Sequence, residues 1–316
     1  MSGHVFTFGE TMGLYRATEL GSLETVTDAK IGIGGADSNV AIGLQRLGID
    51  AIWTGRVGDD GLGRRIVREL RAEGISVKAT VDPHAPTGVM LKEKTTAETT
   101  RVYFYRRDSA GSRVSPTDLD EHLIRSAALL HVTGITALIS SSGRETVYTA
   151  IDIARDAGVP VSFDVNHRPS LVQPTDDPGA IYRHIATRSD ILFAGEEEAR
   201  LIATAPCDVP GLAAQLADLG PVEVIIKLGA EGSAGIAAGK VFHRDALPIR
   251  VVDSVGAGDA FVAGYLAARL QGLDIGQRTT LATTAGAFAC LGPGDWESLP
   301  RPADLRLLSG GEPVTR

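Results

Sequence analysis

The sequence predicts an α/β fold, in which a doubly wound, mostly parallel β-sheet is flanked by helices and accompanied by a small β-sheet. Short β-branched and apolar runs alternate along the chain with helical periods, which is the pattern of a parallel sheet wrapped by helices. Two stretches, about residues 11–33 and 86–108, break this alternation. Two glycine-rich segments each lead directly into a helical period. We expect residues 1–316 to form one domain.

The alternating runs place the elements of the main sheet in order along the chain. Helices are expected between the strands, for example over 61–73 and 145–157. In the stretches that break the alternation, 89–93 and 100–106 are expected to be extended strands with no helix between them, which predicts a separate small sheet. The predicted strands of the main sheet are 5–8, 51–54, 129–132, 159–163, 191–193 and 222–226.

Composition limits the possible function classes. With 316 residues, 43% of them hydrophobic, the chain can bury a large core. A net charge of −8 gives no basic footprint for nucleic acid, and no apolar run approaches the ~20 residues of a membrane span. We therefore expect a cytoplasmic protein with neither nucleic acid nor a membrane as partner. Cys207 and Cys290 are far apart and lack a histidine at metal-ligand spacing, so we expect two reduced thiols.

The most informative segment is DSVGAGD at residues 253–259, which runs straight into an apolar helical period. Gly256, Ala257 and Gly258 would leave backbone N–H groups bare at the helix start, where the helix dipole adds positive charge. Asp259, on the first turn, would lie beside an anion held there and could take a proton from an attacking hydroxyl. An ordinary helix start explains the same residues equally well, so a second observation is needed.

That observation is the segment GGADSN at 34–39, which is followed by a helical period and the triplet Arg-Leu-Gly at 46–48. Together the two segments resemble the paired signatures of the PfkB, or ribokinase-like, carbohydrate kinases. In that family an N-terminal Gly-Gly precedes an Asn and a helix ending in Arg-Leu-Gly, and the C-terminal signature is Asp-Thr-x-Gly-Ala-Gly-Asp. Ser254 replaces the Thr here and keeps the hydroxyl.

The resemblance implies a ribokinase-like fold, with the small sheet as a lid over the sugar and often a dimer contact. It implies an ATP-dependent sugar kinase that uses Mg²⁺ and transfers the γ-phosphate to a primary hydroxyl, with Asp259 as base. Asp253 would shape the phosphate loop or a site for a monovalent cation, a further candidate cofactor; an Asp-capped turn is its other interpretation. The sugar would lie near Gly34, Gly35 and Asn39.

Three further elements resemble nucleotide or metal contacts of the family. Lys227, Gly229 and Gly232 match its Lys-x-Gly-x-x-Gly turn, although a plain hairpin has similar residues. Gly286 lies in a small-residue helix that borders the adenine in the family, and helix packing explains it equally well. Glu198 matches the Glu of the family's Asn-x-x-Glu, with Gly195 at the Asn position. We therefore expect Glu198 in the magnesium shell, through water, or simply in the acidic first turn of a helix.

Two basic segments bear on the substrate. YRRDSA at 105–110 and FDVNHR at 163–168 resemble stretches of the 2-keto-3-deoxygluconate kinases, a PfkB branch. Arg106 and Arg168 would read a substrate carboxylate, because the guanidinium fork matches it bidentately. Alternatively, Arg106 is a solvated edge charge, and Arg168 caps a loop or contacts the nucleotide phosphates. Asn166 of the second stretch is assigned to the nucleotide site.

The chain also departs from that branch. Met90 and Phe104 stand where those kinases commonly carry sugar-facing tyrosines, and Asp295 either reaches the sugar or forms a turn. Fructokinase or another ketose or ribose kinase is therefore the alternative substrate class, and a non-catalytic sugar-binding relative is a further one. A dinucleotide dehydrogenase and a P-loop kinase are disfavoured, because neither a Gly-x-Gly-x-x-Gly after the first strand nor a Gly-x-x-x-x-Gly-Lys-Ser/Thr occurs.

Overall fold

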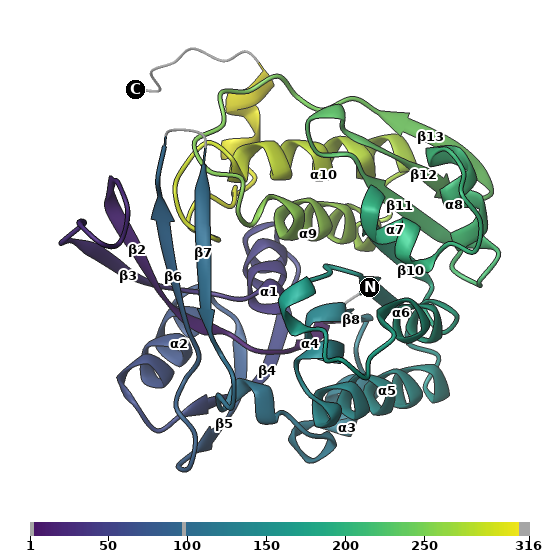
Figure 1. Ribbon diagram of the computed structural model, residues 1–316. Coiled ribbons are helices and arrows are strands. Elements are labelled where there is room, and N and C mark those ends of the chain that lie inside the picture. The colour runs from purple at the N-terminus through teal and green to yellow at the C-terminus, as the bar shows by residue number, and fades with distance from the viewer. Residues whose placement is uncertain (1–2, 97–98, 310–316) are drawn as a thin grey trace.

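The computed structural model describes residues 3–96 and 99–309 (Figure 1), and within these ranges its main sheet has nine strands. The strand order is β13-β12-β11-β10-β9-β8-β1-β4-β5. All neighbours pair in parallel except at the β11–β12–β13 edge, which is antiparallel. The strands are β1 Val5–Phe8, β4 Ala51–Gly58, β5 Ser76–Asp82, β8 Leu129–Thr133, β9 Val161–Asp164, β10 Ile191–Gly195, β11 Glu223–Lys227, β12 Ser233–Ala237 and β13 Lys240–Arg244.

All six strands predicted for the main sheet are present, with ends shifted by a few residues. Three strands lie outside the predicted set, and each has a weak apolar signal. Strand β5 has mostly exposed and half-buried positions, β12 consists mostly of small residues, and β13 is a largely exposed edge strand. The doubly wound α/β prediction is therefore confirmed, and the antiparallel edge is an addition to it.

Helices cover both faces of this sheet, and each face has its own apolar core. One core packs α3 to α8 against the sheet, and the other packs α1, α2, α9 and α10. None of the helices in the described ranges is long and apolar enough to cross a bilayer. The helices are α1 Ala36–Arg46, α2 Gly61–Ala72, α3 Glu121–Arg125, α4 Gly134–Ile139, α5 Ser141–Asp156, α6 Pro178–Ala186, α7 Glu196–Ile202, α8 Val209–Ala217, α9 Ala257–Leu270 and α10 Ile275–Ala289.

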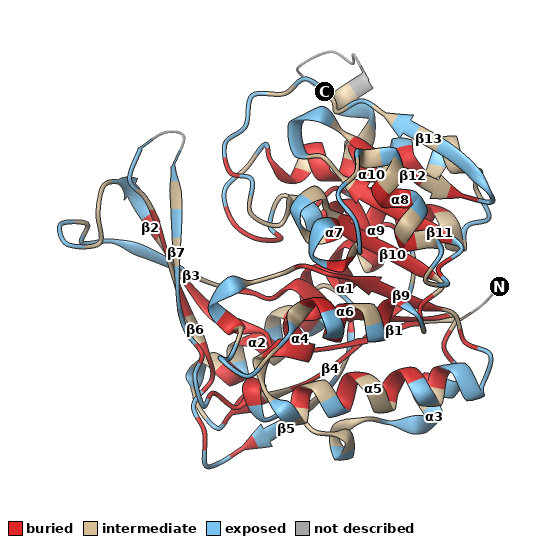
Figure 2. Ribbon diagram, turned by 45° about the vertical axis from the view of Figure 1, so that its right-hand side comes forward, coloured by how far each residue is buried: buried red, intermediate tan, exposed pale blue. Residues whose placement is uncertain are grey.

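The second sheet, which we call the lid sheet, stands away from the body and carries many exposed residues (Figure 2). Its strands β2 Met12–Leu20, β3 Ala29–Gly34, β6 Val89–Lys94 and β7 Thr100–Tyr105 pair in the order β3-β2-β6-β7. They arise from the two stretches that broke the helix–strand alternation, so the separate small sheet is confirmed. On one face, Met12, Leu14 and Met90 form a small buried cluster.

Candidate active site

The carboxyl ends of neighbouring parallel strands bring polar residues to one edge of the main sheet. Thr133 ends β8, Asp164 ends β9 and Lys227 ends β11, while Glu10 follows β1 by two residues. Ligands of open α/β sheets bind outside this edge, because loops from several strands meet there. The helix that completes the site, α9, comes from the far end of the chain and packs beside α1 (Figure 1).

The start of α9 has the geometry expected of the anion hole. Gly256 is the N-cap with a φ of 80°, a left-handed conformation that favours glycine. A Cβ on Gly256 would lie 1.9 Å from the carbonyl oxygen of Asp295, so any side chain there would clash. No side chain caps the helix, which leaves its first N–H groups without that common partner.

Asp259, on the first turn of α9, is held by two amides. Its side chain is buried, with Oδ2 accepting a hydrogen bond from Asn39 Nδ2 at 2.8 Å and Oδ1 accepting one from Asn166 Nδ2 at 3.3 Å. Burial raises the pKa of Asp259 from 3.8 to about 6, and the Asn39 bond opposes that rise. The carboxylate is therefore mostly ionised at neutral pH, while its affinity for a proton is higher than that of an exposed aspartate.

Charges of both signs, on buried and half-buried side chains, lie near Asp259. Lys227 Nζ lies 2.7 and 2.9 Å from the two oxygens of Asp164. Burial alone would lower the pKa of Lys227, but the carboxylates of Asp164 and Glu198 raise it above its ordinary value. Burial raises the pKa of Asp164, and Lys227 offsets part of that rise. Arg168 is half-buried nearby, with one hydrogen bond in the described residues, from Nη1 to the His167 carbonyl at 3.0 Å.

A cavity of about 530 Å³ opens beside the anion hole. It brings together four residues predicted for the nucleotide, Lys227, Gly229, Gly232 and Gly286, with Ala257 and Gly258 of the anion hole. Asn166 and Asp253, also predicted for this site, are not among its lining residues. A mostly apolar wall is what a purine ring needs. That wall includes Leu247, Pro248, Ile249, Val251, Phe261 and Ala287.

Glu198 has a structural role in the fold. Its Oε2 accepts from the N-cap backbone, Gly195 N, at 2.6 Å at the start of α7, and its Oε1 accepts from His167 N at 2.8 Å. Each oxygen keeps a second lone pair, so a water-mediated metal contact is compatible with these bonds. Within the described residues, no group of three or more His, Cys, Asp or Glu side chains could hold a metal ion by itself.

Three of the residues predicted for the substrate, Gly34, Met90 and Asp295, lie together where the lid sheet meets the body. Gly34 allows a close approach, since its Cβ would lie 2.3 Å from both Met90 Cε and Asp295 Oδ2. Arg106 follows β7 and is 8% exposed, which rules out the solvated edge charge as its role. Its Nε donates to Glu10 Oε2 at 2.7 Å, and its guanidinium lies over the Phe104 ring, 5.8 Å from the centroid.

Two buried residues of this site were missed by the sequence analysis. Glu10 accepts from Arg106 and from the Ser109 hydroxyl, and the signal for it was a carboxylate soon after the first strand. Lys92, on β6, pairs with Asp253 and Asp295, two residues that the sequence analysis did name. No local signal marked Lys92, because a lysine on a predicted lid strand is normally solvated.

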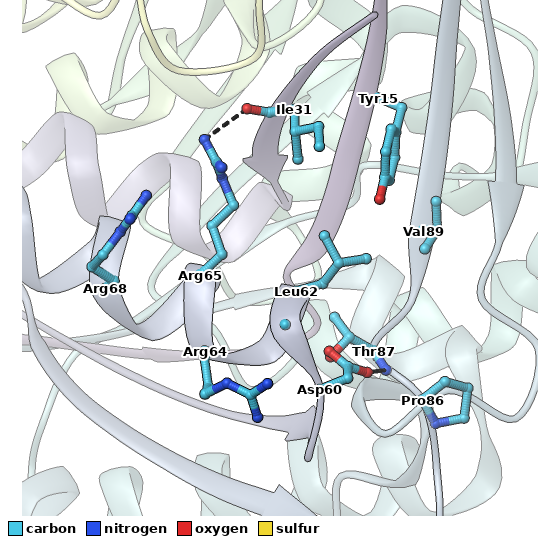
Figure 3. Close-up of a pocket in the computed structure, with 11 residues that line it drawn as sticks. Tyr15, Ile31, Asp60, Leu62, Arg64, Arg65, Arg68, Pro86, Thr87 and Val89 are labelled. Atoms are coloured by element: carbon cyan, nitrogen blue, oxygen red, sulfur yellow. Dashed lines mark hydrogen bonds between the residues drawn. The ribbon is translucent and has the colours of Figure 1, made fainter.

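A different cavity, of about 650 Å³, lies on the outer face of the lid sheet, opposite the face that carries the cluster of Met12, Leu14 and Met90 (Figure 3). Tyr15, Ile31 and Val89 of three lid strands contribute to its wall, and Arg65 of α2 donates to the Ile31 carbonyl at 2.8 Å. None of the residues predicted for the active site lines it. This groove is therefore separate from the Asp259 site.

Comparison with known proteins agrees with this geometry. Residues 2–302 match the family described as pfkB family carbohydrate kinase. The chain belongs to the PfkB family. The sequence-based expectation of a carbohydrate kinase is thereby confirmed, and the non-catalytic relative, dehydrogenase and P-loop alternatives have no comparable support.

Similar proteins span nearly the whole chain. A 2-dehydro-3-deoxygluconokinase of Bacillus subtilis is 36% identical over 299 residues, which cover 93% of this chain and 91% of that protein. A 2-dehydro-3-deoxygalactonokinase of Haloferax volcanii is 31% identical, with 99% and 98% covered. An E. coli protein assigned as a ribokinase II, solved in complex with ATP and Mg²⁺, is 25% identical with a TM-score of 0.87, covering 97% of this chain and 99% of that one.

Proposed function

We propose that this PfkB kinase phosphorylates 2-keto-3-deoxygluconate or its galacto epimer at a primary hydroxyl, with ATP as donor. The observations that carry the proposal are Arg106, which is buried beside Glu10 after the last lid strand, and Arg168, whose charge acts on Asp259. Relatives named for the gluco and galacto substrates, at 36% and 31% identity, support the same substrate class. Because ATP is the proposed donor, we expect the reaction in the cytoplasm.

The transfer uses two features of α9. The terminal phosphates of ATP lie against the N–H groups at Gly256, Ala257 and Gly258, where the helix dipole stabilises negative charge. The sugar oxygen forms a bond to the γ-phosphorus while the bond from that phosphorus to the bridging β–γ oxygen breaks, and ADP leaves. The hydroxyl proton passes to Asp259, which Asn39 and Asn166 hold in place.

Magnesium would be held mainly by the phosphates and water. Asp164, Glu198 and Asp259 outnumber the positive charges of Lys227 and Arg168 in this cluster, which favours a divalent cation nearby. When bound, Mg²⁺ neutralises charge on the transferred phosphate. A monovalent cation at Asp253 is not part of this proposal, because the Lys92 ammonium lies 2.6 Å from that carboxylate.

The two arginines have different surroundings. Glu10 neutralises the charge of Arg106, so Arg106 would orient a substrate carboxylate rather than attract it by net charge. Its Nη1 and Nη2 make no hydrogen bond within the described residues and are available as donors. Arg168 forms no ion pair within 4 Å in the described residues, so its guanidinium is available to a substrate carboxylate. A keto acid would therefore use Arg106 for orientation and Arg168 for charge.

An assay of ADP release with Mg-ATP tests the proposal. It compares 2-keto-3-deoxygluconate, its galacto epimer, fructose and ribose at matched concentrations. The proposal expects a clear preference in kcat/KM for one of the two keto acids. A preference for fructose would leave the kinase mechanism standing and reject the carboxylate role of both arginines.

We also propose that two copies of the chain pair through the outer face of the lid sheet. Tyr15, Ile31, Tyr103 and Tyr105 share this face by strand register, and the last three are at least 40% exposed. An apolar exposed face of this kind is typical of an interface. Light scattering on the purified protein should give a dimer mass, and Tyr105→Ser should shift it toward the monomer. A wild-type monomer at micromolar concentration would contradict the proposal.

A further inference from the structure

Lys92 is buried between the lid sheet and the start of α9, and the roles assigned so far leave it unused. Its side chain is 3% exposed. Its Nζ lies 2.6 Å from Asp253 Oδ2 and 3.3 Å from Asp295 Oδ1, and donates to the Gly294 carbonyl at 3.2 Å. A buried ammonium is stable only when oxygens replace its water. Here three oxygens from two separate segments surround it.

One of those segments leads into α9, and the other contacts the N-terminus of this helix. Asp253 Oδ1 accepts from Val255 N at 3.2 Å, one residue before the N-cap Gly256. The other segment touches the same glycine, since the Cβ position of Gly256 lies 1.9 Å from the Asp295 carbonyl oxygen. The partners of Lys92 therefore fix both sides of the anion hole. Without its charge, two buried carboxylates would repel each other beside a site that must accept phosphate.

We propose that Lys92 is a positioning residue whose ammonium serves as a built-in monovalent cation for the anion hole. It holds Asp253 and Asp295 against the start of α9, so the enzyme needs no inorganic monovalent cation at this place. Only the kinetic test of this inference rests on the proposed function, because it needs the proposed substrate to measure turnover. Since Lys92 belongs to lid strand β6, the same contacts join the lid sheet to the phosphate site.

Lys94 provides a matched control. It lies two residues further along β6, on the same face of the strand, and its Nζ donates at 2.5 Å to the carbonyl of Val252, next to Asp253. Unlike the buried Lys92, Lys94 is half-buried and has no carboxylate partner in the described residues. Lys94→Met thus removes a lysine from the same strand without unpairing a buried charge.

The kinetic test measures kcat and the KM for ATP in tetramethylammonium, Na⁺, K⁺ and NH₄⁺ chloride at equal ionic strength. The kcat of wild type should not depend on which of the four salts is present, and the same should hold for Lys94→Met. Lys92→Met should lose about tenfold in kcat in tetramethylammonium, because the anion-hole donors lose their alignment. K⁺ or NH₄⁺ should restore part of that loss by entering the space the ammonium left. A wild type that depends on K⁺, or a slow Lys92→Met that no cation rescues, would overturn the proposal.

A second measurement does not depend on turnover or on the sugar. The thermal unfolding midpoint of Lys92→Met should be lowered in tetramethylammonium and should rise in K⁺ or NH₄⁺, while the midpoints of wild type and Lys94→Met stay level. If Lys92→Met does not fold, the double variant Lys92→Met/Asp295→Asn replaces it, because it carries one buried carboxylate fewer than Lys92→Met. Its midpoint should depend on the cation in the same way. A midpoint that does not respond to K⁺ or NH₄⁺ would count against the proposal, whereas a failed substrate assay alone would reject only the proposed function.

Discussion

The edge of the main sheet and the lid sheet both carry residues predicted for the active site, but they are built differently. At the sheet edge, functional groups are fixed by strand ends and by the start of α9, and they are mostly buried. The lid sheet is half-exposed and meets the body through ion pairs, Arg106 with Glu10 and Lys92 with Asp253 and Asp295. The difference suggests a division of work, in which the body supplies the chemistry and the lid selects the substrate.

The largest effect should come from the body. Asp259→Asn should lower kcat by about 10²–10⁴-fold, because the proton acceptor is lost while the shape of the site is kept. ATP affinity, measured by calorimetry, should change little. The control Asp59→Asn removes an exposed carboxylate that pairs with Arg64 and should leave kcat unchanged. Near-normal turnover of Asp259→Asn would show that Asp259 is not the proton acceptor and would contradict the assignment of the chemistry to the body.

The anion hole should be the next most sensitive feature. Gly256→Ala should reduce kcat by about 10–10²-fold, since its Cβ would collide with the Asp295 carbonyl and displace the N–H donors. Gly272→Ala is a matched control after the other end of α9. Gly272 also has a positive φ, of 77°, but no atom lies within 4 Å of its Cβ position. It should therefore lower the unfolding midpoint without changing kcat; equal kinetic losses in both variants would contradict the anion-hole assignment.

The pH profile should report Asp259. Burial raises its pKa to about 6, and the carboxylate must be ionised to accept the proton. The value of kcat/KM should therefore be flat near pH 8 and fall by about fivefold between pH 6 and pH 5, and by about tenfold for each further pH unit. A profile that stays level to about pH 4.5, near the ordinary value for an aspartate, would show that the base is a different or more exposed group.

The pH dependence of the unfolding free energy should report another buried carboxyl of the body, that of Asp37. Burial raises the pKa of Asp37, on α1, from 3.8 to about 8, with the nearby Asp259 charge adding to the rise and Thr133 and Thr136 opposing it. A raised pKa stabilises the fold fully below about pH 4, and this contribution is lost as the pH rises to about 8. Asp37→Asn should match wild type near pH 4 and exceed it by at least ~1 kcal/mol at pH 8. Equal unfolding free energies at both pH values would mean that Asp37 is ionised in the fold.

The sequence predicted the body better than the lid contacts, for a physical reason. The anion hole and Asp259 belong to one helix start, so a local pattern contains both. Glu10 and Arg106 are 96 residues apart, and Lys92 is 203 residues from Asp295, so their pairing depends on how the lid sheet docks. The sequence therefore indicated the named members of each pair, Arg106, Asp253 and Asp295, but not their partners. Glu198 shows a further limit, because a glutamate in the first turn can accept from the N-cap backbone N–H as well as serve a metal.

The most direct test of the division between body and lid is the substrate selectivity of Arg106→Ala. The measurement is kcat/KM for 2-keto-3-deoxygluconate and for fructose, in wild type, Arg106→Ala and Arg106→Lys, with thermal midpoints to confirm folding. The account predicts that Arg106→Ala loses about 10²-fold with the keto acid, far more than with fructose, at nearly unchanged KM for ATP. Equal losses with both sugars would contradict it, because Arg106 would then support only the structure around Glu10.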